Sequence, residues 1–216
     1  MFRTALVLLI AAQVPPGITR TQLLDNSTVM IARLNMAPGA REQVHTHPFS
    51  AVIVQLTPGE VEMRIGTRPE TTRKERGTVD FIAAEMPHAA ANVGTSGFDI
   101  VTVAIKPDRK PAGTQPPAEA PPGITRTPVL ENPVARVVNV VFAPGSREPV
   151  HTHPYDLVLV QLTPGRMEVM IGAERDAGKS VKDYAAGEVV FVPRDTPHAF
   201  ASADKGRVEL LSVAIK

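Results

Sequence analysis

The sequence contains no cysteine among its 216 residues. This absence excludes disulfides, thiolate nucleophiles and sulfur-ligated metal sites, so any metal site must use nitrogen and oxygen ligands. It also leaves the redox compartment undetermined. Tryptophan is absent as well and only 2 tyrosines are present, which argues against a broad stacking platform for sugars or nucleic-acid bases.

An excess of charge of one sign is also lacking. Lys and Arg total 23 against 22 Asp and Glu, a formal net charge of +1. A field this weak does not attract a nucleic acid or an anionic membrane, so we predict neither partner. Hydrophobic residues make up 43% of the chain, enough to bury a core in one large domain or in two domains of about 100 residues.

The N-terminus is the one place with a run of apolar residues typical of a targeting signal. "MFRTALVLLIAAQ" places an arginine before an apolar run that ends in small residues, the layout of a secretory signal peptide. We predict a signal peptide over residues 1–14 and export to the periplasm or the exterior, with a cytoplasmic location as the alternative. The other interpretation of "TALVLLI" is a first β-strand, but the second half of the chain has no counterpart to it. The run is too short to span a bilayer, so no membrane anchor is expected after processing.

The rest of the chain repeats itself. "PPGITRT" begins at residue 15 and again at residue 121, a step of 106, and "HTHP" and "QLTPG" recur at the same step. "VAIK" begins at residues 103 and 213, a step of 110, so the second copy carries four extra residues before this motif. We predict two homologous units in tandem, residues 15–106 and 121–216. The proline-rich segment 107–120 between them is the predicted linker.

Within each unit, apolar residues alternate with a period of two. "VARVVNVVFAPG", "GEVVFVP" and "RVELLSVAI" are short, rich in Val and Ile, and bounded by Pro-Gly or charged turns. This pattern is typical of β-strands, and several such strands in about 95 residues predict a small sandwich or barrel. We therefore expect an all-β protein with little helix. The two "ITRT" segments are expected as edge strands that pair with the sheet of the partner barrel.

All 6 histidines fall at matching places in the two units. The two histidines of each "HTH" lie on one face of a strand, because side chains two residues apart point the same way. A third histidine follows a later strand, in "MPHAAAN" and "TPHAFAS". A single histidine is usually a surface or core residue, but a repeated triad with no histidine to spare favours metal sites. The predicted ligands are His45, His47, His88, His151, His153 and His198.

The parity of the same strands marks further residues that could line a pocket. These candidates are Arg41, Gln43, Gln55, Arg147, Gln161 and Tyr155. For the arginines the alternative is a salt bridge with Glu42 or Glu148 at the barrel rim, and for the tyrosine it is core packing. The predicted cofactor is a divalent transition metal (Fe, Ni, Mn, Zn or Cu), up to one per barrel, because three nitrogen ligands do not select among these metals. The expected partner is a small-molecule ligand or substrate, and a homodimer is left open.

On these residues the chain resembles a bicupin, a protein of the cupin superfamily with two jelly-roll barrels in tandem. The first cupin motif consists of a glycine, five residues, HxH and a closing glycine, and the second centres on the third histidine. Both units match the first motif and match the second in part. The matching glycines of the first motif are Gly39, Gly59, Gly145 and Gly165.

The resemblance departs from the common cupin site at its acid. Cupins commonly supply a glutamate three or four residues after HxH, where this chain has Ala51 and Val52 or Leu157 and Val158. The nearest carboxylate, Asp156, is expected to point away from the imidazoles. Known cupins with only three histidines include cysteine dioxygenase and diketone-cleaving dioxygenases, so the resemblance implies a metal-dependent dioxygenase acting on a small molecule. The alternative is a non-catalytic cupin that binds a small ligand or a structural metal, because this fold hosts many functions.

Overall fold

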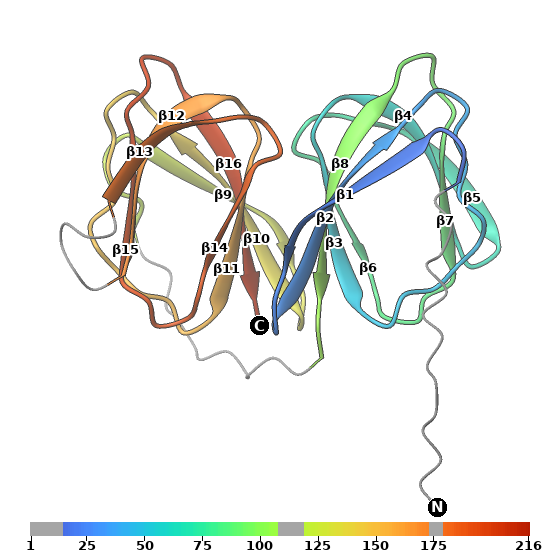
Figure 1. The fold of residues 1–216 in the computed structure, drawn as a ribbon, viewed down its shortest axis with the longest axis horizontal. Helices are drawn as coiled ribbons and strands as arrows, with labels where there is room; N and C mark the ends of the chain where they lie inside the picture. Colours follow the sequence, from blue (N-terminus) through green and yellow to red (C-terminus); the bar gives the residue numbers. More distant parts are fainter. Residues whose placement is uncertain (1–14, 108–118, 173–178) are drawn as a thin grey trace, which may run out of the picture.

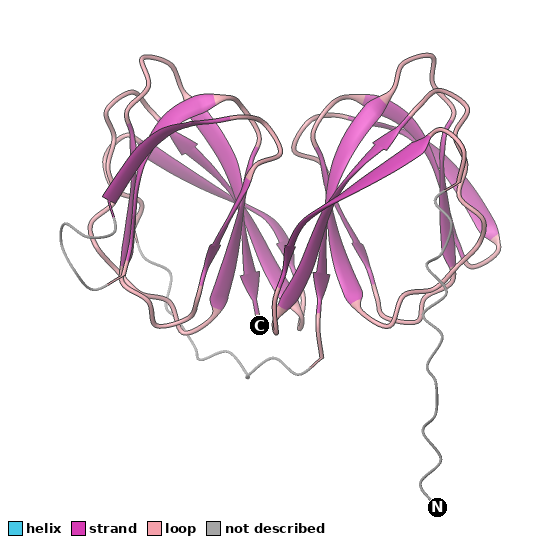
Figure 2. Ribbon diagram, in the orientation of Figure 1, coloured by secondary structure: helices cyan, strands magenta, loops and turns pink. Residues whose placement is uncertain are grey.

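The chain forms two β-barrels that lie side by side (Figure 1), as seen in a computed structural model that describes residues 15–107, 119–172 and 179–216. The predicted signal peptide, residues 1–14, and most of the predicted linker, 107–120, lie outside the described residues. The described residues form strands, turns and loops (Figure 2) and contain no helix that could cross a membrane. The prediction of an all-β protein with two tandem jelly-roll barrels is confirmed.

The strands of the first barrel form two antiparallel sheets, ordered β1-β2-β8-β3-β6 and β5-β4-β7. They are β1 (Ile18–Asp25), β2 (Val29–Met36), β3 (Ser50–Gln55), β4 (Gly59–Ile65), β5 (Arg68–Lys74), β6 (Val79–Ile82), β7 (His88–Asn92) and β8 (Phe98–Ile105).

The second barrel repeats this arrangement, with sheets ordered β14-β11-β16-β10-β9 and β13-β12-β15. Its strands are β9 (Ile124–Glu131), β10 (Ala135–Phe142), β11 (Asp156–Gln161), β12 (Gly165–Ile171), β13 (Lys179–Tyr184), β14 (Val189–Val192), β15 (His198–Ser202) and β16 (Val208–Ile215). Each strand therefore has an equivalent in the other barrel.

The expectation that the "ITRT" segments pair with the partner barrel is wrong. These segments open β1 and β9, and each pairs antiparallel with the next strand of its own barrel, β2 or β10. Two features explain this choice. Only three residues, 26–28, separate β1 from β2, which forces a hairpin, and the side chain of Asn26 accepts hydrogen bonds from two backbone N–H groups of that turn. In addition, Ile18 and Ile124 are buried in the core of their own barrel.

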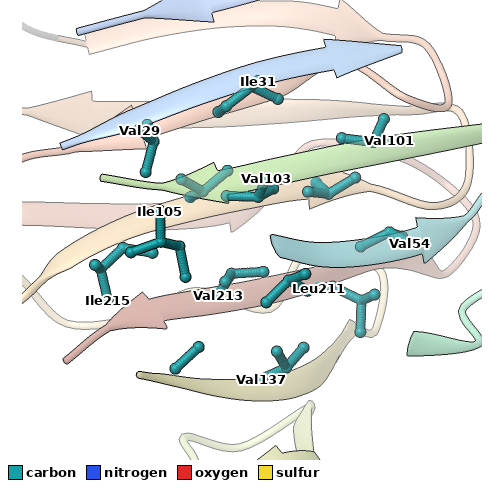
Figure 3. Close-up of a cluster of buried hydrophobic side chains, with 14 of the residues drawn as sticks. Val29, Ile31, Val54, Val101, Val103, Ile105, Val137, Leu211, Val213 and Ile215 are labelled. Carbon is teal, nitrogen blue, oxygen red and sulfur yellow. The ribbon is translucent and has the colours of Figure 1, made fainter. Parts of the chain in front are cut away.

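A shared hydrophobic core lies between the barrels. The two five-stranded sheets face each other, and valine, leucine and isoleucine side chains from β2, β3 and β8 pack with those from β10, β11 and β16 (Figure 3). Two polar contacts join the barrels beside this core: Thr28 Oγ1 donates to Asp156 Oδ2 at 3.0 Å, and Arg33 Nη1 donates to the carbonyl of Ala186 at 3.2 Å. The barrels therefore form one unit held by apolar burial.

This shared core explains a departure from simple alternation. All six residues of β11, "DLVLVQ", are buried, because one face of the strand lines its own barrel and the other face lies against the first barrel. The equivalent β3 has four buried residues of six. Strands buried on both faces are expected to be continuously apolar, which the central part of β11 is. No histidine is among the residues of this shared core.

Candidate metal centres

The structure brings each predicted histidine triad together inside its own barrel. His45 lies directly opposite His88, with backbone hydrogen bonds in both directions at 2.9 and 3.0 Å, and His47 follows two residues later. In the first barrel the three imidazole centroids are 4.4, 4.6 and 5.2 Å apart. The second barrel forms the same bridge between His151 and His198. In each triad one ring nitrogen from every histidine lies within 4.8 Å of the others.

Backbone carbonyls fix the orientation of two imidazoles in each triad. The Nδ1 atoms of His45 and His88 each donate to a carbonyl two residues earlier at 2.8 Å, and His151 and His198 do the same. A carbonyl can only accept a hydrogen bond, so Nδ1 carries the proton and Nε2 keeps its lone pair. These lone pairs are directed toward the centre of the triad. Histidines that bind a metal are held in this way.

The spacing of the nitrogens fits neighbouring positions around one metal ion. Nε2 of His45 and Nε2 of His47 are 3.0 Å apart, and the corresponding atoms of His151 and His153 are 3.1 Å apart. With metal–nitrogen bonds of about 2.1 Å, this separation corresponds to an angle of about 90° at the metal, whereas a tetrahedral angle would need about 3.4 Å. The donor set therefore fits a metal that holds three imidazoles on one side and keeps further positions open.

Burial and mutual repulsion keep the second histidine of each HTH motif neutral. Burial, with the positive charges that His45, His88 and Arg20 would bring, lowers the pKa of His47 to about 4. In the second barrel, burial lowers the pKa of His153 to about 3, together with the positive charges of His151, His198 and Arg126. Burial also lowers the pKa of His198. Protons therefore compete weakly with a metal for these nitrogens at neutral pH.

Neither triad includes a carboxylate among the described residues. Asp156, the nearest acid in sequence, points toward the other barrel, where its Oδ2 accepts from Thr28 and its Oδ1 accepts from the backbone N–H of Arg194. Ala51 and Leu157, at the usual place of the cupin acid, are both buried. Each centre therefore offers three neutral nitrogen ligands.

The two predicted pocket arginines form salt bridges at the barrel rim. Arg41 pairs with Glu62 at 3.0 Å, and Arg147 pairs with Glu168 through two contacts of 2.6 and 3.1 Å. In the first barrel both residues lie opposite Ala91, on the two strands that flank it, so their side chains share one face. Their charges are therefore used by these pairs rather than by the triads.

The two glutamates suggested as partners of those arginines bind elsewhere. Glu42 Oε2 accepts from the backbone N–H of Ala90 at 3.1 Å. Glu148 Oε1 accepts from Arg126 Nη2 at 2.6 Å. The arginines and glutamates alternate along the chain, but pairing across the strands, not proximity in sequence, decides which ones meet.

The remaining pocket candidates have different roles. Tyr155 stacks on His153, with ring centroids 5.1 Å apart and planes within 10°, so it flanks the second triad. Gln43 is exposed, and its backbone carbonyl accepts the hydrogen bond from Nδ1 of His45. Gln55 and Gln161 are buried, and each donates to a carbonyl two residues on at 2.8 Å. Gln161 also lines a small cavity in the second barrel, large enough for about one water molecule.

Sequence reasoning missed a pair of arginines near the triads. Arg20 and Arg126 occupy equivalent places in the repeated "ITRT" segments, two residues after Ile18 and Ile124. Both isoleucines are buried in their own barrel, and side chains two residues apart on a strand share a face. The arginines therefore start from the inner face of their strands, and their charges reach His47 and His153. The signal for these arginines is the repeated motif itself, in which an arginine follows the isoleucine by two residues.

Comparisons with known proteins agree with this architecture. A family model described as "Cupin domain" matches residues 138–214, which lie in the second barrel. No curated protein matches the chain in sequence.

Among solved structures, the chain is similar to AerE from Microcystis aeruginosa, with 15% identity, coverage of 94% of this chain and 95% of that one, and a TM-score of 0.76. It is also similar to oxalate decarboxylase from Lactobacillus farciminis, solved as a formate complex (12% identity, 94% and 83% coverage, TM-score 0.72). A third similar structure is salicylate 1,2-dioxygenase from Pseudoaminobacter salicylatoxidans with gentisate, with 12% identity, coverage of 95% of this chain and 76% of that one, and a TM-score of 0.71. At these identities the likeness shows the fold.

Proposed function

From the premise that this chain is a pair of tandem cupin barrels, we propose that it is a metal-dependent oxidoreductase of the dioxygenase type acting on a small molecule. The observation that carries the proposal is the arrangement of the imidazoles. Three neutral nitrogens converge at neighbouring positions, no carboxylate among the described residues joins them, and further positions stay open. A small molecule and oxygen both need such positions.

The residues of the chain would hold and orient the metal. His45, His47 and His88 are the ligands in the first barrel, and their equivalents serve the second. The backbone carbonyls that accept from Nδ1 keep the imidazoles in the correct tautomer. These three neutral ligands would leave a divalent metal its full charge, so that it would act as a Lewis acid on a substrate, and a redox-active metal such as iron would also supply electrons to oxygen.

The structural relatives support this class of reaction. They include a salicylate 1,2-dioxygenase and oxalate decarboxylases, which are named for oxidation or cleavage of small carboxylates. Those names describe the relatives, and at 11 to 13% identity they do not fix the reaction of this chain. They make small organic acids the first compounds to test.

One observation favours a second role, that of a structural metal site, in the second barrel. Tyr155 stacks on His153, and Phe200 lies 5.8 Å from His198 between ring centroids. Leu157 and Phe200 are both buried in the core of this barrel, where the first barrel has Ala51 and Ala90. The larger side chains leave less space beside the second triad, so a metal there could hold the barrel together without turnover.

Oxygen uptake by the iron-loaded protein is the direct test. The full chain would be tested with thiols, diketones, flavonols and small carboxylates, beside a double variant, His88→Ala with His198→Ala, that should hold no metal. Uptake with one of these classes that disappears in the double variant would support the enzyme. No uptake with any class, together with tight binding of a ligand, would favour the non-catalytic alternative.

A further inference from the structure

The two barrels carry the same arginine but differ in how its charge is compensated. Arg20 and Arg126 each follow a buried isoleucine by two residues and so lie on the inner face of β1 and β9. Both are followed in the chain by a glutamate at the same distance, Glu42 or Glu148. The sequence alone therefore gives the two centres the same charges.

In the second barrel the arginine forms an ion pair. Arg126 Nη2 lies 2.6 Å from Glu148 Oε1, and the glutamate side chain is only 8% exposed. A short ion pair with a buried carboxylate uses the guanidinium and partly compensates its charge. The ion pair therefore offsets part of the charge of Arg126, although that charge still lowers the pKa of His153.

In the first barrel the arginine keeps its charge. The carboxylate of Glu42 turns to the backbone N–H of Ala90 instead. Within residues 15–107, 119–172 and 179–216, no side chain forms an ion pair or hydrogen bond with Arg20. A guanidinium with five donors thus remains available at the edge of the first triad.

The first barrel also has smaller side chains at two places on its inner face. Ala51 and Ala90 occupy the places of Leu157 and Phe200, and Ala90 is only half-buried where Phe200 is buried. Ile65, which lies directly opposite His88 on the neighbouring strand, is 47% exposed. A ligand beside this triad would therefore meet a free cation and an apolar side chain.

We propose that the first barrel binds a small organic carboxylate, with Arg20 as the residue that selects for its negative charge, while the second barrel, whose Arg126 is paired with Glu148, selects for charge less strongly. This inference rests on the proposed metal site and adds the class of substrate and the barrel that takes it. The carboxylate accepts hydrogen bonds from the guanidinium. A second oxygen of the same ligand, such as that of a hydroxyl group, reaches the open side of the triad, where it would bind the metal.

The test compares a charged ligand with a neutral one at a single centre. His198→Ala confines cobalt(II) to the first barrel, and the visible absorption of the cobalt reports binding of glycolate or of glycolamide, its neutral analogue. Arg20→Gln should weaken glycolate binding about 10-fold, the size expected for a charged hydrogen bond that is partly exposed, and should leave glycolamide within about twofold. Arg20→Lys, which keeps the charge, should recover part of the glycolate affinity.

A reciprocal variant tests the second barrel. With His88→Ala confining cobalt to that barrel, Glu148→Gln should release Arg126 and strengthen glycolate binding, while glycolamide binding stays the same. If Arg20→Gln leaves glycolate affinity unchanged, or weakens glycolamide equally, the assignment of Arg20 is overturned. This test measures ligand binding and not turnover. A failure to consume oxygen would therefore contradict the proposed enzyme and leave the assignment of Arg20 intact. A failure to take up cobalt would overturn the metal site on which both proposals depend.

Discussion

Removing the third histidine of one barrel should empty that barrel and spare the other. His88 and His198 are 5% and 1% exposed, and each donates Nδ1–H to a carbonyl. Among the described residues, no further histidine or carboxylate joins either triad to replace them. His88→Ala leaves two imidazoles and no carboxylate at the first centre. Loss of a group that only hydrogen-bonds a metal-binding histidine already costs about 10- to 100-fold in metal affinity, so loss of a ligand should cost more than that.

The two centres should respond independently, because no ligand is shared between the barrels and a hydrophobic core separates them. Metal analysis after dialysis against a weak chelator should give about two metals per chain for the wild type and about one for either single variant. Circular dichroism provides the control, since each variant should keep the all-β spectrum. A single variant that loses both metals, or a wild-type chain that binds only one, would refute the account of two separate centres.

Three further predictions follow from the packing and the charges. Leu157 is buried and faces the inside of the second barrel, so Leu157→Glu puts a carboxylate at the common cupin position. Metal titration should show tighter binding in the second barrel. Urea unfolding should show a less stable metal-free protein, because the carboxylate is buried without a partner. Because the pKa values of His47 and His153 are lowered in the folded state, the unfolded chain binds more protons below pH 6.5. The free energy of unfolding of the metal-free protein should therefore fall as the pH drops from 6.5 toward 4, and a flat urea midpoint would contradict this. Gly187 and Gly145 both have a positive φ, but only a Cβ at 187 would lie 2.6 Å from a side chain of the other barrel, that of Leu56. Gly187→Ala should therefore destabilise the protein by about 1–3 kcal/mol more than Gly145→Ala. Equal midpoints for the two glycine variants would argue against a tight interface.

The sequence predicted the features that rest on local pattern and repetition. Alternating valines gave the strands, the repeated motifs gave two equivalent units, and the spacing of HTH gave two imidazoles on one face. The position of the third histidine followed from its place after a strand, and the structure sets His88 directly opposite His45. These predictions needed only the geometry of a strand and the assumption that similar segments fold alike.

Features that depend on packing between barrels could not be obtained in this way. Nothing in the period of two distinguishes an edge strand that pairs with its own barrel from one that crosses to the other. The short turn at residues 26–28 does indicate a hairpin, and it would have corrected the expectation for β1. The shared core is harder to predict, because apolar residues on both faces of β11 fit either a central strand or a contact with another domain.

The difference between the two arginines shows where repetition itself misleads. The segments "ITRT" and "HTHP" are identical in both units, and each unit has a glutamate three residues before the first histidine. Glu42 and Glu148 also make the same backbone contact, donating N–H to the carbonyl of Ala90 or of Phe200 at 2.9 Å. Their carboxylates nevertheless have different partners, and the residue that each one faces across the strands is small in one barrel and aromatic in the other. Two units with the same histidines, arginine and glutamate thus differ in which of these charges are paired. Duplication followed by such a change in pairing would let one barrel bind a charged ligand while the other stabilises the chain.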